Sequence, residues 1–167
     1  MAKLKDAFCS YCGAAFAPGM DYPRTCGGCK ETTWRNPIPV AVLMVPAGDG
    51  LLTVRRAIEP GAGKLALPGG YVNFGETWQQ AAAREVKEET SLPLDPSRIQ
   101  FHSLHSTPDG HALLIFGETD EKLPRIALWS FAATPEVSEL VVMLKPEEMA
   151  FPLHTQVASE WFARRGF

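Results

Sequence analysis

The stretch from Gly70 to Leu92 constrains this chain more than any other, because it joins a strong helix signal to clustered acidic side chains. Residues 76–90 hold no glycine or proline and are rich in Ala, Glu, Gln and Lys, which favour helix. At 3.6 residues per turn, Glu85, Glu88 and Glu89 share one arc of roughly 100°, beside an apolar arc. Carboxylates this close repel by about 0.2–0.5 kcal/mol per pair, and a divalent cation reverses that repulsion. Oxygen ligands of this kind suit Mg²⁺.

The spacing within this stretch resembles the Nudix box. The matching positions are Gly70, Glu76 after five residues, Arg84-Glu85-Val86-x-Glu88-Glu89 after seven more, and the aliphatic Leu92. Ser91 departs from the pattern, because the family has glycine there. That glycine is expected to serve a left-handed turn where the helix ends, so serine should cost about 1 kcal/mol locally.

The resemblance implies an enzyme, a hydrolase that uses Mg²⁺ or Mn²⁺ to cleave a pyrophosphate bond. In such enzymes, metal ions held by the box glutamates bridge the pyrophosphate oxygens and lower the pKa of the attacking water. Carried over onto this sequence, the metal ligands are Glu85, Glu88, Glu89 and the carbonyl of Gly69, which precedes the first box glycine. The bare backbone of Gly70 is expected to lie beside the substrate.

Relatives often use a further carboxylate from outside the box as a ligand or general base. Glu118, at the end of a predicted strand, is expected to take that catalytic role here. Its rivals are Glu121, Glu136 and Glu139. Arg55 and Arg56 adjoin in another predicted strand and so point to opposite faces. Arg56 is expected to bind the diphosphate, while its neighbour faces solvent or an acidic partner.

Two further box residues are expected to orient the site. Glu76 is predicted to open the helix, where a carboxylate favours the positive end of the helix dipole. In relatives the arginine at the position of Arg84 is ion-paired with that glutamate and braces the loop that carries the first glycines.

The four cysteines form two Cys-x-x-Cys pairs, Cys9 with Cys12 and Cys26 with Cys29, separated by thirteen residues. This spacing suits tetrahedral thiolate coordination of Zn²⁺, and four thiolates leave no open position for a substrate. We therefore predict a structural zinc ribbon over residues 1–35, which depends on the metal to fold, and a Nudix domain over residues 36–167. Two disulfides or a redox pair are the alternatives. Nucleic-acid binding by the ribbon stays open but is not favoured, because its basic residues are scattered.

Apolar runs bounded by turn signals predict strands over residues 40–45, 51–56, 99–104, 112–117, 127–131 and 139–144, and a closing helix over residues 152–165. Periodicity alone supports an α/β or α+β fold. The resemblance implies a Nudix α/β/α sandwich, with a mixed and mostly antiparallel sheet on which the box helix packs.

Composition bounds the class of protein. Of 167 residues, 46% are hydrophobic and 21% charged, which is typical of a soluble globular domain with a real core. The net charge of −3 argues against nucleic-acid binding by an all-over basic surface. No apolar run reaches the length of a signal peptide or a membrane span, so we expect a cytoplasmic protein with no membrane partner.

Two other groups of side chains are ambiguous. The histidines show no metal-ligand spacing and are expected to be surface or capping groups: His102, His105, His111 and His154. Four aromatic residues could stack on a nucleobase or lie in the core, and the sequence favours neither: Tyr71, Phe74, Phe116 and Trp129.

The order of ribbon and box resembles the C-terminal part of NADH pyrophosphatases, and also shorter ribbon-bearing proteins of the ADP-ribose pyrophosphatase type. ADP-ribose or an NADH-type dinucleotide is therefore the expected small-molecule substrate, and a homodimer is the family expectation. Residues 105–111 replace the Ser-Gln-Pro-Trp-Pro-Phe-Pro motif of NADH pyrophosphatases, which weakens the case for NADH. The alternatives are a nucleic-acid-binding module that keeps the box as scaffold, an enzyme that processes nucleotide-capped RNA 5′ ends, and a sensor that binds ADP-ribose without turnover.

Overall fold

A computed structural model describes residues 6–166 of the chain. The chain divides into two compact units, one ending at Pro37 and the other beginning at Ile38, two residues after the boundary that we predicted. In the first unit, β1 (Arg24–Thr25) and β2 (Thr32–Thr33) form a short antiparallel pair. Most of this unit consists of turns, so its conformation depends on its cysteines more than on regular secondary structure.

The second unit is built on two sheets. In the first sheet, β3 (Ile38–Met44) pairs antiparallel with β7 (Gly69–Tyr71) on one side and parallel with β9 (Ala112–Thr119) on the other. The outer strand β8 (Ile99–Ser106) is antiparallel to β9. The parallel pair makes this sheet mixed, as predicted.

The second sheet is centred on β5 (Gly50–Arg56). Its three neighbours are all antiparallel to β5: β4 (Pro46–Ala47), β6 (Leu65–Ala66) and β10 (Val137–Met143). Residues 67 and 68 cross from β6 in this sheet to β7 in the other, so this short crossing joins the two sheets immediately before the box.

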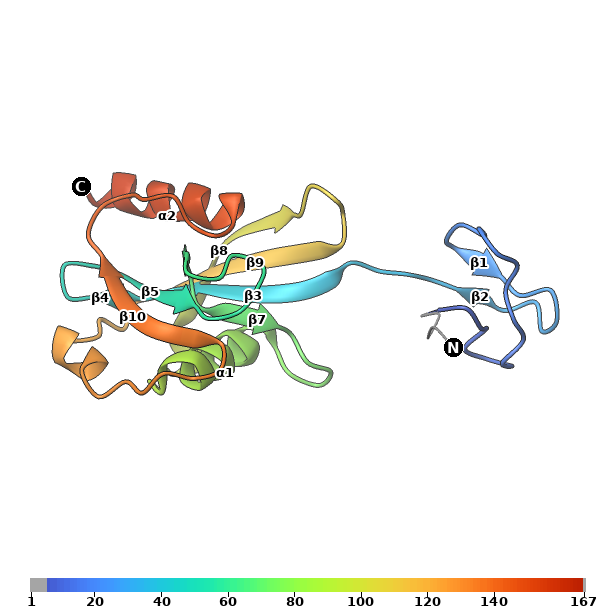
Figure 1. Cartoon of the computed structure of the whole chain (residues 1–167), viewed down its shortest axis with the longest axis horizontal. Coiled ribbons are helices and arrows are strands. Elements are labelled where there is room, and N and C mark those ends of the chain that lie inside the picture. The colour runs from blue at the N-terminus through green and yellow to red at the C-terminus, as the bar shows by residue number, and fades with distance from the viewer. Residues whose placement is uncertain (1–5, 167) are drawn as a thin grey trace. The chain divides into compact units, whose positions relative to one another are not determined.

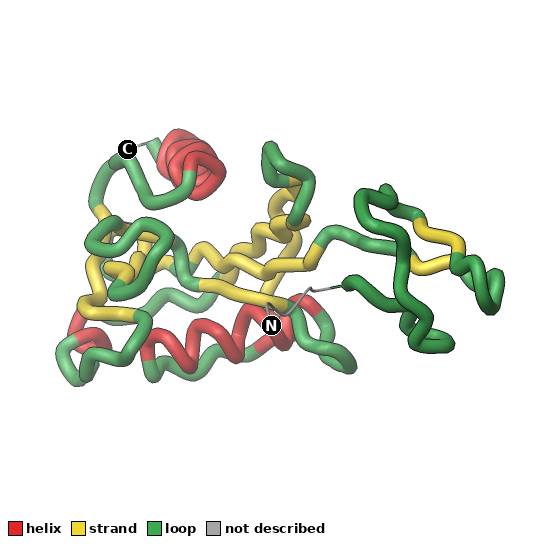
Figure 2. The backbone as a smooth tube through the Cα atoms, turned by 45° about the vertical axis from the view of Figure 1, so that its right-hand side comes forward, coloured by secondary structure: helices red, strands yellow, loops and turns green. Residues whose placement is uncertain are grey.

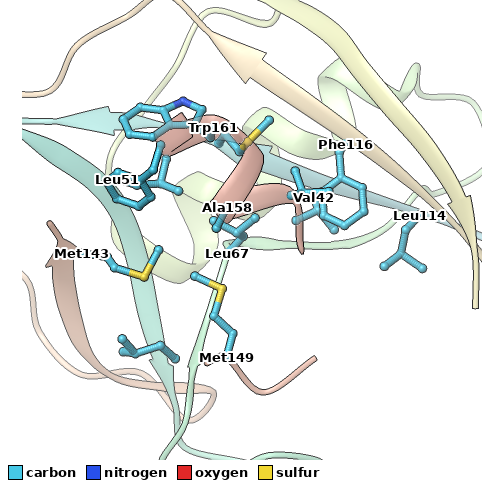
Figure 3. Packing of buried hydrophobic residues seen from close by; sticks show 13 residues of the cluster. Val42, Leu51, Leu67, Leu114, Phe116, Met143, Met149, Ala158 and Trp161 are labelled. Atoms are coloured by element: carbon cyan, nitrogen blue, oxygen red, sulfur yellow. The ribbon is translucent and has the colours of Figure 1, made fainter. Parts of the chain in front are cut away.

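The helices α1 (Trp78–Thr90) and α2 (Pro152–Arg165) lie on opposite sides of the sheets (Figures 1 and 2). Alternate residues of β3 separate the two cores. Ala41 and Leu43 pack in a cluster with residues of α1, whereas Val42 and Met44 pack in a cluster with α2. The second cluster brings Phe116 and Trp161 together with residues of β5 and β10 (Figure 3). The predicted α/β/α sandwich is confirmed.

The box helix begins at Trp78, two residues after Glu76, because Thr77 is its N-cap. The Thr77 side chain accepts from the Gln80 N–H, and the Gln80 side chain accepts from the Thr77 N–H. At the other end Ser91 has φ +63°, and its N–H donates to the Lys87 carbonyl. The predicted left-handed turn at Ser91 is confirmed, whereas the prediction that Glu76 opens the helix is wrong.

One predicted strand, over residues 127–131, is also wrong. The chain there forms a 3₁₀ turn, η2 (Arg125–Leu128), and pairs with neither sheet. Its short alternation of apolar residues has no neighbouring strand to complete it, and only Leu128 packs against the α1 core. A second 3₁₀ turn, η1 (Pro96–Arg98), leads into β8. The other predicted strands are present with ends shifted by a few residues, and the closing helix has its predicted bounds.

None of the helices in the described part of the chain is both long and apolar enough to cross a membrane.

The strained turn at Ser91 predicts that Ser91→Gly stabilises the protein. Glycine adopts positive φ without a steric penalty, and the Ser91 side chain is exposed, so the free energy of unfolding should rise by about 1 kcal/mol. Urea unfolding followed by tryptophan fluorescence measures the change. Ser106→Gly, at an exposed position in β8, is the control and should lower stability; a loss of stability in both variants would contradict this account.

Candidate active site and metal site

The second half of α1 lies against the glycine pair at the start of β7. A Cβ atom at Gly70 would collide with the carboxylate of Glu85, and one at Gly69 would collide with the Ala41 carbonyl of β3. Both positions therefore require a bare backbone. Glu89 lies beside them, where its Oε2 accepts from the Gly69 N–H at 3.0 Å. The structure thus brings together Gly69, Gly70, Glu85 and Glu89.

Burial shifts both of these carboxyl groups toward the neutral form. Glu89 is 8% exposed, and burial raises its pKa to about 8. The Gly69 N–H and the charge of Arg56 oppose that rise, while Glu85 and Glu136 add to it. Burial also raises the pKa of Glu85, against the hydrogen bond from Arg84. Positive charge close to Glu85 comes from Arg84, while at Glu89 the effect of burial outweighs the charge of Arg56.

Arg84 holds the outer part of the site in one arrangement. Its guanidinium makes ion pairs with Glu76 and Glu85, each at 2.7 Å, and donates to the Tyr71 carbonyl at 2.9 Å. The hydrogen bond to Glu76 is the main cause that raises the pKa of Arg84, and the same contact lowers the pKa of Glu76. The ion pair implied by the resemblance is therefore present, and it braces the loop between β7 and α1.

Glu88 lies apart from the two inner carboxylates. Its side chain is 59% exposed and pairs with Arg84 at 3.2 Å. The three box glutamates do not converge on one point, since the four cysteines alone form a tight cluster of metal-binding side chains among residues 6–166. Oxygen donors from Glu85, Glu89 and the nearby glycine backbone nevertheless suit a hard divalent cation, which would add positive charge beside Glu89.

The two neighbouring arginines of β5 point in different directions, as predicted. Arg55 pairs with Glu139 at 2.7 Å. Arg56 donates to the Pro60 carbonyl at 2.7 Å, and its guanidinium lies 5.1 Å from the centre of the Phe151 ring. The charge of Arg56 lowers the pKa of Glu89, against the larger effect of burial. Arg56, rather than Arg55, thus faces the acidic site.

The structure does not bring Glu118 to the box carboxylates. Along β9, Glu118 shares the face of Phe116, which packs in the α2 core. Its carboxylate makes ion pairs with Arg164, at 2.9 Å, and with Arg165. A cavity of about 650 Å³ opens beside it, lined by Phe101, Trp161 and neighbouring residues but by none of the box glutamates.

Glu136 is the rival carboxylate that reaches the site. Its charge raises the pKa of both Glu85 and Glu89. The position follows from strand pairing, because Val137 of β10 lies opposite Arg56 and the Glu136 carbonyl accepts from the Ala57 N–H at 2.7 Å. Of the other rivals, Glu139 pairs with Arg55, and Glu121 accepts from the Asp95 N–H.

The expectation that His154 is a surface or capping group is wrong. His154 is 6% exposed, and its Nδ1 accepts from the Leu67 N–H at 3.1 Å. Sequence reasoning missed this contact, because no local pattern links two residues so far apart. Of the four aromatic candidates, Phe116 is buried, whereas Tyr71, Phe74 and Trp129 are exposed.

The four cysteine sulfurs of the first unit gather around one point, with all ligand atoms within 4.8 Å of one another. The Sγ atoms of Cys9 and Cys29 lie 3.7 Å apart, and those of Cys12 and Cys26 lie 3.6 Å apart. A tetrahedron with metal–sulfur bonds of about 2.3 Å has edges of about 3.8 Å, while a disulfide needs about 2.05 Å. Backbone N–H groups of Cys29 and Gly28 lower the pKa of Cys26 to about 6, which favours the thiolate. The cluster could hold a metal ion such as zinc.

The sandwich and the acidic helix beside a glycine pair are features of hydrolases that act on pyrophosphate bonds, the enzyme class that we predicted. A family model of the NUDIX domain matches residues 35–164, well over half of the chain, and the chain belongs to that family.

Solved structures support the fold. A NUDIX hydrolase from Nitrosomonas europaea matches with a TM-score of 0.69 and 24% identity, over 95% of this chain and 92% of that one. A MutT protein from Methanosarcina mazei Go1 matches with a TM-score of 0.60 and 22% identity, over 80% and 99% of the two chains. A bifunctional NMN adenylyltransferase/ADP ribose pyrophosphatase from Francisella tularensis, complexed with AMP and a Mn ion, matches with a TM-score of 0.55 and 24% identity, over 66% and 34%.

The curated relatives are longer than this chain. Over 109 residues the chain is 28% identical to the NAD-capped RNA hydrolase NudC of Yersinia pestis (strain Pestoides F), which covers 65% of this chain and 41% of the relative. The same protein of Yersinia pseudotuberculosis serotype O:1b matches to the same extent. The chain thus spans about two fifths of the length of these relatives.

The raised pKa of Glu89 predicts a pH dependence of stability in protein that keeps its zinc but has no added Mg²⁺ or Mn²⁺. Between the unfolded value of 4.5 and about 8, the folded chain binds more protons, so the free energy of unfolding falls as pH rises. His154, whose pKa burial lowers to about 3, acts in the opposite direction up to its unfolded value of 6.5.

The window from pH 6.5 to 8 isolates Glu89. There the wild type should lose stability as pH rises, by at most about 1.4 kcal/mol per pH unit, and Glu89→Gln should lose much less. Chemical unfolding at each pH measures both proteins. Glu88→Gln, at the exposed neighbour, is the control and should keep most of the wild-type slope; equal slopes in wild type and Glu89→Gln would refute the prediction.

Proposed function

We propose that this protein hydrolyses the pyrophosphate bond of a nucleoside diphosphate linked to another group, releasing two monophosphates, with Mg²⁺ or Mn²⁺ as cofactor. The observation that carries the proposal is the pair of buried carboxylates, Glu85 and Glu89, set against the glycine backbone of residues 69–70. An acidic pair in which burial raises both pKa values, set beside bare backbone, suits cations bound together with an anionic substrate.

The divalent ions, when bound, would neutralise charge on the pyrophosphate and lower the pKa of the attacking water. Glu85 and Glu89 would hold them, with Glu88 and the Gly69 carbonyl assisting. The Gly70 backbone lies against the Glu85 carboxylate, so a substrate bound by these ions would pass close to it.

Two residues outside the box complete the proposed site. Arg56 would bind phosphate oxygens, because its charge acts on Glu89 while its Nε donates to the Pro60 carbonyl. Glu136 is our candidate for the carboxylate that takes a proton from the attacking water. It replaces Glu118 in that role, because Glu118 is already paired with two arginines on the other side of the sheet.

For the substrate we propose ADP-ribose or an NAD-type dinucleotide. The Francisella tularensis structure that shares the fold is named an ADP ribose pyrophosphatase, and the Yersinia relatives are named NAD-capped RNA hydrolases. The second name favours one alternative in particular, an NAD-type cap at the 5′ end of RNA, which would present the same pyrophosphate bond. The net charge of −3 gives such an RNA no general electrostatic attraction.

For the first unit we propose a structural zinc ion held by Cys9, Cys12, Cys26 and Cys29. The sulfur spacing supports zinc. Among the described residues of this unit, only Cys9 and Cys26 are buried hydrophobic residues, so the unit has little core of its own and would depend on the metal to fold. We also propose a cytoplasmic homodimer, as the resemblance implies.

Loss of one inner carboxylate is the direct test of the function. Glu85→Gln should lower kcat by on the order of 100-fold or more on every substrate that the wild type cleaves, because a metal ligand is lost. The substrates are ADP-ribose, NADH, NAD⁺, a diadenosine polyphosphate, a nucleoside triphosphate and a short NAD-capped RNA, each with Mg²⁺ and with Mn²⁺. Wild-type turnover in this variant would sink the mechanism, and the ranking of substrates decides between free dinucleotide and capped RNA.

Two further variants serve as a matched pair in the same assay. Glu136→Gln should lower kcat, whereas Glu118→Gln should leave it near the wild-type value, because Glu118 lies on the α2 side of the sheet. The reverse result would restore Glu118 as the carboxylate outside the box.

Zinc content tests the role of the first unit. The purified protein should hold one zinc ion per chain, and Cys9→Ser should lose it and unfold the first unit alone, because the second unit has its own hydrophobic clusters. Metal analysis and the amide NMR spectrum measure both effects. A zinc-free protein whose first unit keeps dispersed amide signals would contradict the proposal.

A further inference from the structure

The crossing between the two sheets, residues 67–69, is held at each residue by a different element. The Leu67 N–H donates to Nδ1 of His154 on α2 at 3.1 Å. The Pro68 carbonyl accepts from the Leu43 N–H of β3 at 2.9 Å. The Gly69 N–H donates to Oε2 of Glu89 on α1 at 3.0 Å. The junction between β6 and β7 is thus fixed by three partners from three different elements.

The surroundings of His154 on α2 hold its ring in place as the acceptor for the Leu67 N–H. Its ring lies 5.6 Å from the Phe116 ring and 5.0 Å from the Phe151 ring, so it has little freedom to turn. Because Nδ1 accepts a hydrogen bond, the ring carries its proton on Nε2. Burial, with the charge of Arg56 nearby, lowers its pKa to about 3, so the acceptor persists throughout the neutral pH range.

The position of Leu67 affects the position of Gly69, which contacts Glu89 in the proposed cation site. Gly69 is two residues further along, where it pairs with Val42 of β3. The direction of the Gly69 N–H, whose hydrogen bond Glu89 accepts, therefore depends on this pairing and on how the chain enters from Leu67. Phe151 links His154 to a second residue near the site, because its ring lies against both His154 and the guanidinium of Arg56.

We infer that His154 is a positioning residue, which fixes the backbone of residues 67–69 through the Leu67 amide and so orients Glu89 and the Gly69 carbonyl for cation binding. The inference rests on the proposed function for the identity of the site. It differs from a packing role, because it assigns the effect to one acceptor atom rather than to the volume of the ring.

Two substitutions separate the acceptor from the volume. His154→Asn places an acceptor oxygen near the position of Nδ1 but leaves a cavity in the core. His154→Leu fills the core better but offers no acceptor. If packing alone matters, the leucine variant resembles the wild type more closely; if the hydrogen bond matters, the asparagine variant does.

Three measurements apply to both variants. The first is the hydrogen-exchange rate of the Leu67 amide without added Mg²⁺ or Mn²⁺, the second is Mn²⁺ affinity by electron paramagnetic resonance, and the third is kcat on the best substrate. His154→Leu should release the Leu67 amide to exchange and weaken Mn²⁺ binding by about 10-fold, as loss of a supporting partner does elsewhere, with a matching fall in kcat. His154→Asn should retain more of all three properties, despite a lower unfolding midpoint.

Trp161→Phe is the control for lost stability. Trp161 lies two turns further along the same helix, beside Arg165. It shares the core cluster of Leu67 but takes no part in the three hydrogen bonds of residues 67–69, so Trp161→Phe should lower the unfolding midpoint without changing the Leu67 amide or Mn²⁺ affinity. Equal losses in the asparagine and leucine variants, or a larger loss in the asparagine variant, would overturn the inference. So would a loss of Mn²⁺ affinity in Trp161→Phe.

The proposed function fails separately. If Glu85→Gln turns over at the wild-type rate, the site itself is wrong. If Glu85→Gln is inactive while His154→Leu binds Mn²⁺ as the wild type does, only the role of His154 is wrong.

Discussion

Burial of two carboxylates at one place, those of Glu85 and Glu89, is the constraint on which the rest of the structure depends. Like charges withdrawn from water repel one another strongly, and the chain offsets this with fixed partners: the Gly69 N–H and the Arg84 guanidinium. The bare backbone at Gly70 follows from the same constraint, since no side chain fits beside Glu85. The glycine, arginine and glutamate positions of the box thus serve one electrostatic arrangement.

The central strand β3 makes that arrangement possible. Its alternate residues face α1 and α2, and its two edges carry β7 and β9. Packing of α1 against Ala41 and Leu43 directs the acidic face of the helix toward the edge at β7. The place of the proposed cation site at the rim of the sheet is therefore a consequence of how the two cores divide.

Sequence alone could predict the box because its contacts are local, within one helix and its flanks. The pairing of Arg84 with Glu76 and the turn at Ser91 are of this kind. The side of the sheet that Glu118 takes could not be predicted, because the face of a strand residue depends on its partners, and Phe116 fixes that face toward α2. Residues 127–131 look like a strand but have no neighbour to pair with. The contact of His154 spans 87 residues, beyond any local pattern.

The helix α2 is fastened by polar contacts near both ends, at His154 in its first turn and at Arg164 and Arg165 in its last. Between these anchors its buried face is packed along its length against both sheets. A helix held at both ends in this way cannot tilt to widen or narrow the space beside it. Adaptation to bulkier or smaller ligands would then fall to the exposed loops, and evolutionary change in specificity should accumulate in them rather than in the helix.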